Sequence, residues 1–343
     1  MKFIDREKEI TYLKDHLALE PNSMLFVYGP KSSGKSTLLL RVCEMLNPNE
    51  YSINFMDLRR VYISDYKSFQ DTFFLRDAKN KLKDLAKGIT LNAGFFKIPL
   101  DEEKLFSQNP FKVMQNRLEA ARKKGITPVL IIDEIQLLKP IKTNSDDYLI
   151  DKLFNLFIGL TKVMHVAHVI LATSDSYFIE DLYNSSKLAN TSEFMLLDHF
   201  EKTVLNKWLI EEQFNPDEIE NVWNTLGGCP WQIQQVINKR KMGTGVEQTC
   251  KQFVNDAYAK LDEFAYGLLP EEKKVFWLIT QLIVEKGFCD KHEIEENVLF
   301  RILTKKLVAL DHWFYHSDRG HVVANSQSVY LAMERLNKAR NGK

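Results

Sequence analysis

Short apolar runs alternate with amphipathic stretches through the first two hundred residues of the chain. Five runs are rich in large apolar residues and bounded by polar or turn-forming residues, as in strands buried on both faces of a parallel sheet. We expect these strands at residues 24–28, 51–57, 129–133, 168–173 and 192–197. Apolar residues recur at helical spacing between them, which predicts helices at residues 6–18, 35–46, 66–86, 111–124 and 149–163. Residues 88–110, with their Gly and Pro, predict an excursion from an otherwise parallel α/β sheet.

The pattern after residue 200 is first helical and then mixed. Four amphipathic stretches predict helices at 201–212, 216–225, 230–240 and 246–262. The remainder predicts helices at 271–286, 290–296, 298–310 and 326–340, with a β-hairpin at 313–324 closed by Ser317-Asp318-Arg319-Gly320. Three helices and a hairpin are typical of a winged helix. We therefore predict an α/β domain at 1–200, a helical lid at 201–261 and a winged helix at 262–343.

The composition of the chain limits the kinds of binding partner and the cellular compartment that we expect for it. The 343 residues include 46 Lys and Arg against 46 Asp and Glu, so the formal net charge is zero. A neutral chain gives no support for binding bulk nucleic acid or an anionic membrane through charge alone. The first ten residues alternate apolar and charged positions, and no apolar run approaches the roughly 20 residues that span a bilayer. The four cysteines lack zinc-ligand spacing and fit a reducing interior, so we expect a cytoplasmic protein without membrane association.

Residues 29–36 carry the strongest chemical signal, Gly-Pro-Lys-Ser-Ser-Gly-Lys-Ser. They match the Walker A phosphate loop G-x-x-x-x-G-K-[ST], between an expected strand and an expected helix. Gly29 and Gly34 let the backbone turn its N–H groups toward phosphate oxygens, and the following helix offers its N-terminus to the same anion. Lys35 would reach the β- and γ-phosphates, and Ser36 would bind Mg²⁺. The nucleotide-contacting residues expected here are Gly29, Pro30, Lys31, Ser32, Ser33, Gly34, Lys35, Ser36 and Thr37.

Two adjacent carboxylates, Asp133 and Glu134, end the apolar run that begins at Pro128. The carboxyl end of a strand in a parallel sheet faces the ligand crevice. We expect Asp133 to hold Mg²⁺ as a Walker B acid, directly or through water, and Glu134 to polarise an attacking water as general base. A solvated acidic turn would explain the pair alone, but the phosphate loop about a hundred residues upstream favours a hydrolytic site.

Taken in order, four features of the chain resemble the archaeal P-loop ATPases of the signal-transduction (STAND) group, relatives of AAA+ and origin-recognition ATPases. They are a box at residues 3–10, the loop at 29–36, Asp133-Glu134-Ile135-Gln136, and Gly227-Gly228-Cys229-Pro230. The strand end Thr173-Ser174 matches the family's sensor position. The resemblance covers nearly the whole chain and implies an AAA+-like (ASCE) P-loop NTPase sheet, followed by a helical lid and a winged helix.

The resemblance also implies roles for residues outside the two motifs. Ile4 and Arg6 would border the adenine, Pro230 would lie against the nucleotide, and Thr173 or Ser174 would hydrogen-bond the γ-phosphate or its attacking water. Simpler explanations stay open: Arg6 as a helix-surface charge, the two hydroxyls as turn caps, and Pro230 as the start of a helix. The implied cofactors are ATP or ADP with Mg²⁺. The catalytic set that we expect is Glu134, Lys35, Thr173 and Ser174.

One departure from the family bears on the rate of hydrolysis. Many relatives carry a Gly-Arg pair just before the fifth strand, and its Arg acts on the γ-phosphate, whereas residues 188–192 contain no Arg. Because an arginine finger is worth about 10³–10⁵ in rate, we expect slow hydrolysis by the isolated chain, or a partner that supplies the charge.

The C-terminal residues leave two kinds of partner open. The helix expected at 298–310 carries Arg301 and Lys305, which could contact DNA phosphates. Residues 262–343 hold twelve acids and twelve bases, however, and a DNA-binding domain normally has a basic surface. A protein partner or self-association is therefore favoured over DNA.

Three functional hypotheses follow. The leading one is an ATPase that acts as a nucleotide-dependent molecular switch, with ATP and Mg²⁺ between the α/β and helical domains. The second is a DNA-binding protein for which ATP is an allosteric ligand. The third is a nucleotide-binding scaffold with negligible turnover, suggested by the missing Arg.

Overall fold

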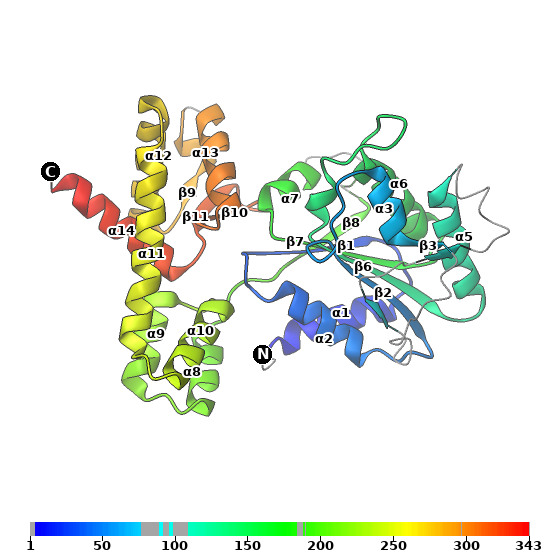
Figure 1. Ribbon diagram of the computed structural model, residues 1–343, viewed down its shortest axis with the longest axis horizontal. Helices are drawn as coiled ribbons and strands as arrows, with labels where there is room; N and C mark the ends of the chain where they lie inside the picture. Colours follow the sequence, from blue (N-terminus) through cyan, green and yellow to red (C-terminus); the bar gives the residue numbers. More distant parts are fainter. Residues whose placement is uncertain are drawn as a thin grey trace.

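A six-stranded parallel sheet, in the order β4-β2-β6-β7-β1-β8, is the centre of the structure (Figure 1). The computed structural model describes residues 4–76, 89–91, 96–98, 109–183, 188, 190–295 and 297–342. The strands are β1 Met24–Tyr28, β2 Tyr51–Asp57, β4 Ile89–Leu91, β6 Thr127–Asp133, β7 His168–Thr173 and β8 Ser192–Leu196. β1 and β7 are buried along their whole length, as their apolar runs predict. The expected parallel α/β sheet is confirmed.

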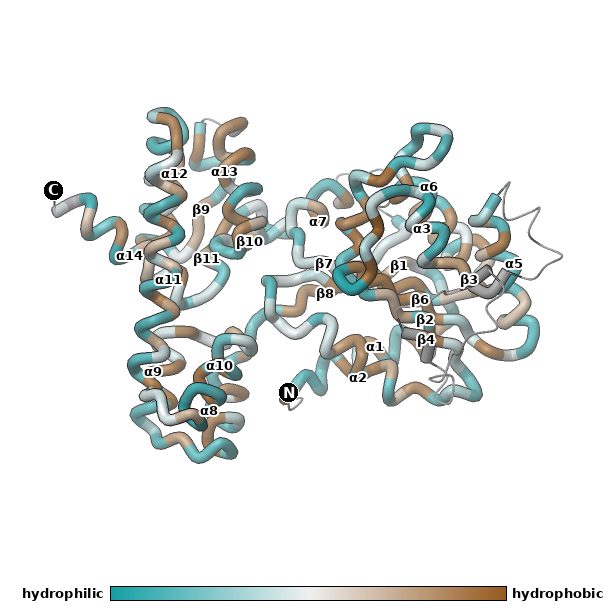
Figure 2. The backbone as a smooth tube through the Cα atoms, in the orientation of Figure 1, coloured by the Kyte–Doolittle hydropathy of each residue, from teal (hydrophilic) through white to brown (hydrophobic). Residues whose placement is uncertain are grey.

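Helices cover both faces of this sheet (Figure 1). α1 Glu7–Ala18 and α2 Lys35–Met45 bury Leu13, Leu38 and Cys43 against one face. The helices whose residues pack on the other face are α3 Tyr66–Phe73, α5 Pro110–Lys123, α6 Leu149–Ile158 and α7 Ser176–Tyr183. α6 continues as a π-helical turn, Gly159–Val163. Figure 2 shows the hydrophobic strands enclosed between these layers.

The segment between β2 and α5 differs from its prediction. A helix was expected over 66–86, but α3 ends at Phe73 and β3 Phe74–Arg76 follows, paired in parallel with β5 Phe96–Ile98. Pairing with a distant strand outweighs the local helical spacing here, because Phe74 is buried in the core in an extended conformation. β4 also joins the main sheet beside β2, where an excursion was expected, and the rest of 77–108 lies outside the described residues.

Four helices follow the sheet: α8 Lys202–Glu211, α9 Pro216–Leu226, α10 Pro230–Lys241 and α11 Val246–Tyr266. α8, α9 and α10 enclose a core around Trp208. α11 is longer than expected and crosses the boundary predicted at residue 261, since Leu261 and Ala265 pack into the C-terminal core. Among the described residues, no helix combines the length and the apolar character that crossing a bilayer requires.

The C-terminal part contains α12 Pro270–Lys286, β9 Cys289–Asp290, α13 Asn297–Ala309, β10 Trp313–His316, β11 His321–Ala324 and α14 Gln327–Asn341. The hairpin β10–β11 is confirmed, and β9 adds a third antiparallel strand. The helix expected at 290–296 is wrong, because Asp290 pairs with His321 in the sheet and only a short 3₁₀ turn, Lys291–Glu293, follows. The winged-helix assignment stays our interpretation of this arrangement.

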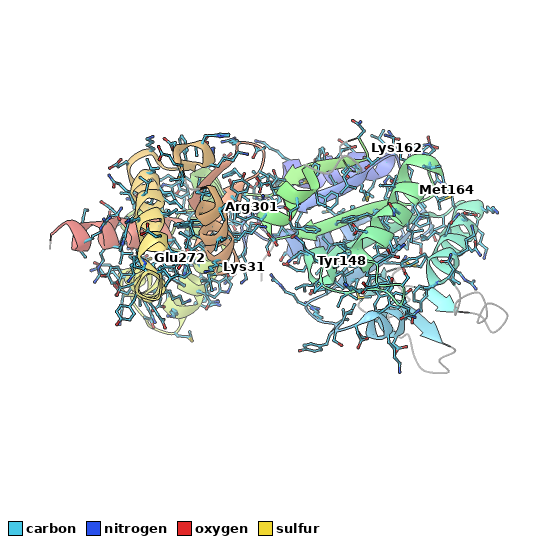
Figure 3. All side chains as sticks on the ribbon, turned by 90° about the horizontal axis from the view of Figure 1, so that it is seen from above. Lys31, Tyr148, Lys162, Met164, Glu272 and Arg301 are labelled. Atoms are coloured by element: carbon cyan, nitrogen blue, oxygen red, sulfur yellow. The ribbon has the colours of Figure 1, made fainter. Side chains whose placement is uncertain are left out.

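The C-terminal part meets the sheet domain at α7. The ring of Tyr177 stacks on that of Tyr315, with centroids 4.6 Å apart. The Tyr177 hydroxyl forms a buried hydrogen bond with Thr304 of α13. Figure 3 shows Arg301 of α13 at this junction, and its guanidinium donates to Asp181 of α7 at 2.9 Å.

Candidate functional site

The phosphate loop is formed between β1 and α2, as its motif predicts. Gly34 caps α2 at φ 98, a left-handed conformation that costs a residue with a Cβ about 1 kcal/mol or more. The Lys35 ammonium donates to the carbonyl oxygens of Gly29 and Pro30, each at 2.9 Å. Burial lowers the pKa of Lys35 to about 8, although the nearby carboxylates of Glu134 and Asp133 oppose this shift. The loop therefore holds a buried cation whose partners are its own carbonyl groups.

Ser36 and Asp133, 97 positions apart in sequence, are joined at the cavity by a hydrogen bond from the Ser36 hydroxyl to the Asp133 carboxylate. Burial raises the pKa of Asp133, while the Ser36 hydrogen bond lowers it. The second oxygen, Oδ1, is buried without a hydrogen-bond partner. A hydroxyl beside an unsatisfied carboxylate oxygen fits Mg²⁺, which binds through one or two carboxylates and the substrate phosphates. Among the described residues, no group of three or more His, Cys, Asp or Glu side chains is placed to bind a metal ion.

Glu134 follows β6 in the left-handed conformation, at φ 60. Its side chain is only 4% exposed and forms an ion pair with Arg59 at 2.7 Å. It also accepts hydrogen bonds from the Gln136 amide and, at 3.1 Å, from the Ser174 hydroxyl. These three partners hold the carboxylate at the cavity wall.

The structure separates the two sensor candidates. Ser174 lines the cavity and touches Glu134. Thr173 is fully buried, and its hydroxyl donates to Gln136 at 2.7 Å. Ser174 is therefore the hydroxyl that can meet a ligand directly, whereas Thr173 orients Gln136.

Arg6, in the box at residues 3–10, holds the phosphate loop through a hydrogen bond to its backbone. Its guanidinium is buried and donates to the carbonyl oxygens of Ser33 at 3.1 Å and Asp198 at 2.6 Å. It also pairs with Glu9 at 2.9 Å and lies 4.6 Å from the centre of the Phe200 ring. Arg6 is thus a buried charge and not a surface charge, and it links α1, the loop and the start of the helical part.

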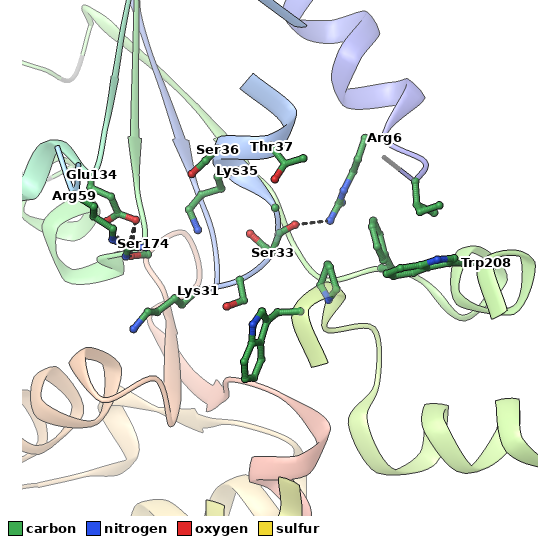
Figure 4. A pocket seen from close by; sticks show the side chains of 16 residues that line it. Arg6, Lys31, Ser33, Lys35, Ser36, Thr37, Arg59, Glu134, Ser174 and Trp208 are labelled. Carbon is green, nitrogen blue, oxygen red and sulfur yellow. Dashed lines mark hydrogen bonds and ion pairs between the residues drawn. The ribbon is translucent and has the colours of Figure 1, made fainter. Parts of the chain in front are cut away.

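These residues enclose a cavity of about 260 Å³ (Figure 4). Figure 4 shows Glu134, Arg59 and Ser174 at one end and Arg6 and Trp208 at the other, with Lys35 and Ser36 between them. Of the residues expected from sequence, the lining includes Ile4, Arg6, Lys31, Ser32, Ser33, Gly34, Lys35, Ser36, Thr37, Glu134, Ser174 and Pro230. Gly29, Pro30 and Asp133 lie behind this lining and contact it through the hydrogen bonds described above. Thr173 also lies behind the lining and is linked to it through Gln136, whose amide donates to Glu134.

Four lining residues were not anticipated: Arg59, Phe200, Trp208 and Trp231. Arg59 follows the carboxyl end of β2, where the rule that ligands bind at strand ends could have identified it. Phe200 and Trp208 form an edge-to-face pair, and half-exposed Trp231 follows Pro230. No motif marks these aromatic residues, because helix packing brings them to the cavity.

The chain was compared with known proteins. A family model described as an ATPase domain predominantly from Archaea matches residues 3–236. An uncharacterized ATP-binding protein of Methanocaldococcus jannaschii is 42% identical over 98% of this chain and 95% of its own length. A second ATP-binding protein of that organism is 37% identical over 98% of this chain and 100% of its own length.

Solved structures share the fold at low sequence identity. A Walker-type ATPase of Pyrococcus abyssi is 17% identical, with a TM-score of 0.61 over 97% of this chain and 96% of that protein. The Aeropyrum pernix ORC2 protein in its ADP form is 11% identical, with a TM-score of 0.51 over 100% of this chain and 97% of that chain. At these identities the likeness concerns the fold alone.

Proposed function

We propose that this chain, which belongs to a family of ATPase domains found predominantly in Archaea, binds ATP with Mg²⁺ in the cavity. It would hydrolyse the nucleotide to ADP and phosphate. One observation carries the proposal: the Ser36 hydroxyl is bonded to Asp133 while Lys35 and Glu134 face the same space. This brings a cation for phosphates, a metal-binding pair and a candidate base to one cavity, and general ATPase chemistry needs those parts.

The phosphate end of the cavity would accept a nucleotide through an exchange of hydrogen-bond partners. Lys35 gives up the carbonyl oxygens of Gly29 and Pro30 to bind the β- and γ-phosphates, an exchange that replaces neutral acceptors with charged ones. Ser36 and Asp133 would hold Mg²⁺, which would supply positive charge beside the phosphates. N–H groups at the start of α2 contribute further positive potential.

Glu134 is our candidate for the general base. It accepts the proton of the attacking water, and Gln136 and Ser174 keep its carboxylate in place. Arg59 lies at the same end of the cavity and is our candidate for the positive charge that residues 188–192 do not supply. A guanidinium beside the developing charge would lower the barrier to hydrolysis.

The opposite end of the cavity suits an adenine ring. Ile4 and Phe200 pack in the same cluster as Trp208 and make this end apolar and aromatic, and Pro230 and Trp231 also line the cavity. Since Ile4 precedes α1 while Pro230 begins α10, a bound base would contact the sheet domain and the helical part together. Binding and release can then change how these parts are oriented, which supports the role of a molecular switch.

Two substitutions test the proposal. Lys35→Ala should abolish ATP binding measured by calorimetry, because it removes the buried cation. Glu134→Gln should keep ATP binding but stop phosphate release, because an amide cannot accept the proton. Undiminished turnover in Glu134→Gln would remove Glu134 as the base, and unchanged ATP affinity in Lys35→Ala would refute the site.

The DNA-binding alternative is less well supported. Arg301, the best placed cation of α13, is paired with Asp181 of the sheet domain. Arg301 would therefore have to give up this ion pair before it could bind a phosphate. Salt-dependent binding of duplex DNA that weakens in Arg301→Ala would favour this alternative, and no DNA affinity at low salt would exclude it.

A further inference from the structure

Lys31, the third residue of the phosphate loop, is held by the C-terminal part of the chain. Its ammonium forms an ion pair with the carboxylate of Asp311. Asp311 lies in the turn between α13 and β10 in a left-handed conformation, at φ 62. Its backbone N–H donates to the carbonyl oxygen of Val308 at 3.1 Å, so the end of α13 fixes its position. The C-terminal part thereby contacts a residue that lines the nucleotide cavity.

Lys31 lies at the end of the cavity that we assign to the terminal phosphate. In Figure 4 its side chain extends on the side of Ser174 and Glu134, away from Arg6 and Trp208. A second hollow of about 390 Å³ is lined by Lys31 and Ser174, and by Asp311 as well. The ammonium therefore has space to turn from Asp311 toward a phosphate.

We propose that Asp311 senses the γ-phosphate: it holds Lys31 until a triphosphate takes that lysine away, and the loss of the pair loosens α13 from α7. The inference rests on the proposed ATP binding. A γ-phosphate attracts the Lys31 ammonium and also repels the carboxylate that has lost its partner. ADP has no such phosphate and leaves the pair intact, so the contact distinguishes the two nucleotides.

Contacts close to the Lys31–Asp311 ion pair connect the cavity to α13. Tyr177, which bonds to Thr304 and stacks on Tyr315, lies three positions after Ser174 at the cavity. The Ser317 hydroxyl donates to the carbonyl oxygen of Ser176 at 3.0 Å. Lys31–Asp311 is thus one of several polar and aromatic contacts between the parts. Loss of this ion pair, together with repulsion between Asp311 and the γ-phosphate, favours a state in which the C-terminal part is detached from α7.

Nucleotide affinity is the first test, measured by calorimetry in the Glu134→Gln protein so that ATP is not consumed. Asp311→Asn removes the charge while keeping a residue that tolerates the left-handed backbone. We expect ATP to bind about three- to tenfold more tightly and ADP to change less than about twofold, because the competing carboxylate acts only on Lys31 and the γ-phosphate. Asp146→Asn is the matched control, since Asp146 is also left-handed and pairs with Lys142 at 2.8 Å in an exposed loop.

Hydrogen–deuterium exchange is the second test. ATP, but not ADP, should raise exchange in residues 176–183 and 301–316, and Asp311→Asn and Lys31→Met should raise it without nucleotide. An unchanged ratio of ATP to ADP affinity in Asp311→Asn would overturn the proposal, as would ATP protecting α13 from exchange. If the Glu134→Gln protein bound no ATP, the proposed function would fail, and that result is seen before any Asp311 variant is compared.

Discussion

The close approach of Gly228 to Phe200 allows a sharp test of how the helical part is joined to the nucleotide site. The Phe200 N–H donates to the carbonyl oxygen of Gly228 at 2.9 Å. A Cβ on Gly228 would lie 2.7 Å from the Phe200 carbonyl carbon and 2.8 Å from its backbone nitrogen, closer than real contacts allow. Gly228→Ala must therefore push two backbone segments apart.

The cost of this substitution can be worked from its parts. Losing one backbone hydrogen bond costs about 0.5–1.5 kcal/mol net, and overpacking a rigid contact costs about 1–3 kcal/mol. The free energy of unfolding should fall by about 1.5–4.5 kcal/mol. Since Phe200 and Pro230 both line the cavity, their separation should also weaken ATP binding by about tenfold or more.

Chemical denaturation and ATP calorimetry measure the two effects. Gly267→Ala is the control, because its methyl group would meet only ordinary contacts, 3.7 Å from the Phe264 carbonyl oxygen and 3.8 Å from that of Glu263. That variant should behave like the parent protein. If Gly228→Ala matched the parent in both stability and ATP affinity, the close approach would have no energetic role and our reasoning would be wrong.

Four further predictions concern three side chains of the cavity. Because burial lowers the pKa of Lys35 to about 8 and phosphate binding needs its ammonium, ATP binding should take up a proton above pH 8 and weaken by up to about tenfold per pH unit. Calorimetry in two buffers of different ionisation enthalpy checks this, and equal affinity at pH 7 and 9.5 would contradict it. Over the same range the stability of the nucleotide-free protein should rise, since the unfolded chain, with its Lys35 pKa near 10.5, then binds more protons. Arg59→Met should lower kcat at least about tenfold through loss of the guanidinium beside Glu134, and an unchanged or higher kcat in a phosphate-release assay would exclude that role. Arg6→Ala should cost about 2–4 kcal/mol in urea unfolding because it leaves two carbonyl groups without their donor, while Arg41→Ala, on an exposed helix pair, should change stability by less than about 0.5 kcal/mol.

The order of strands and helices in the sheet domain was largely predictable. β1 and β7 are buried on both faces, so an unbroken apolar run was needed and could be recognised. The failures occur where distant pairing decides the structure. Phe74 leaves α3 to pair with Phe96, and Asp290 joins β9 through its contact with His321. Local spacing carries no information about such partners.

The candidate site likewise contains residues that the sequence identifies and contacts that only the fold creates. The sequence by itself identified Lys35, Ser36, Asp133 and Glu134 as candidates, because the proposed phosphate binding, metal binding and proton transfer require such side chains at a loop and a strand end. Only the tertiary structure decided that Arg59 pairs with Glu134, that Thr173 is turned away from the cavity, and that Asp311 reaches Lys31. These contacts join residues as many as 280 positions apart. Packing of whole helices and strands sets such distances, whereas a motif specifies only the chemistry at its own position.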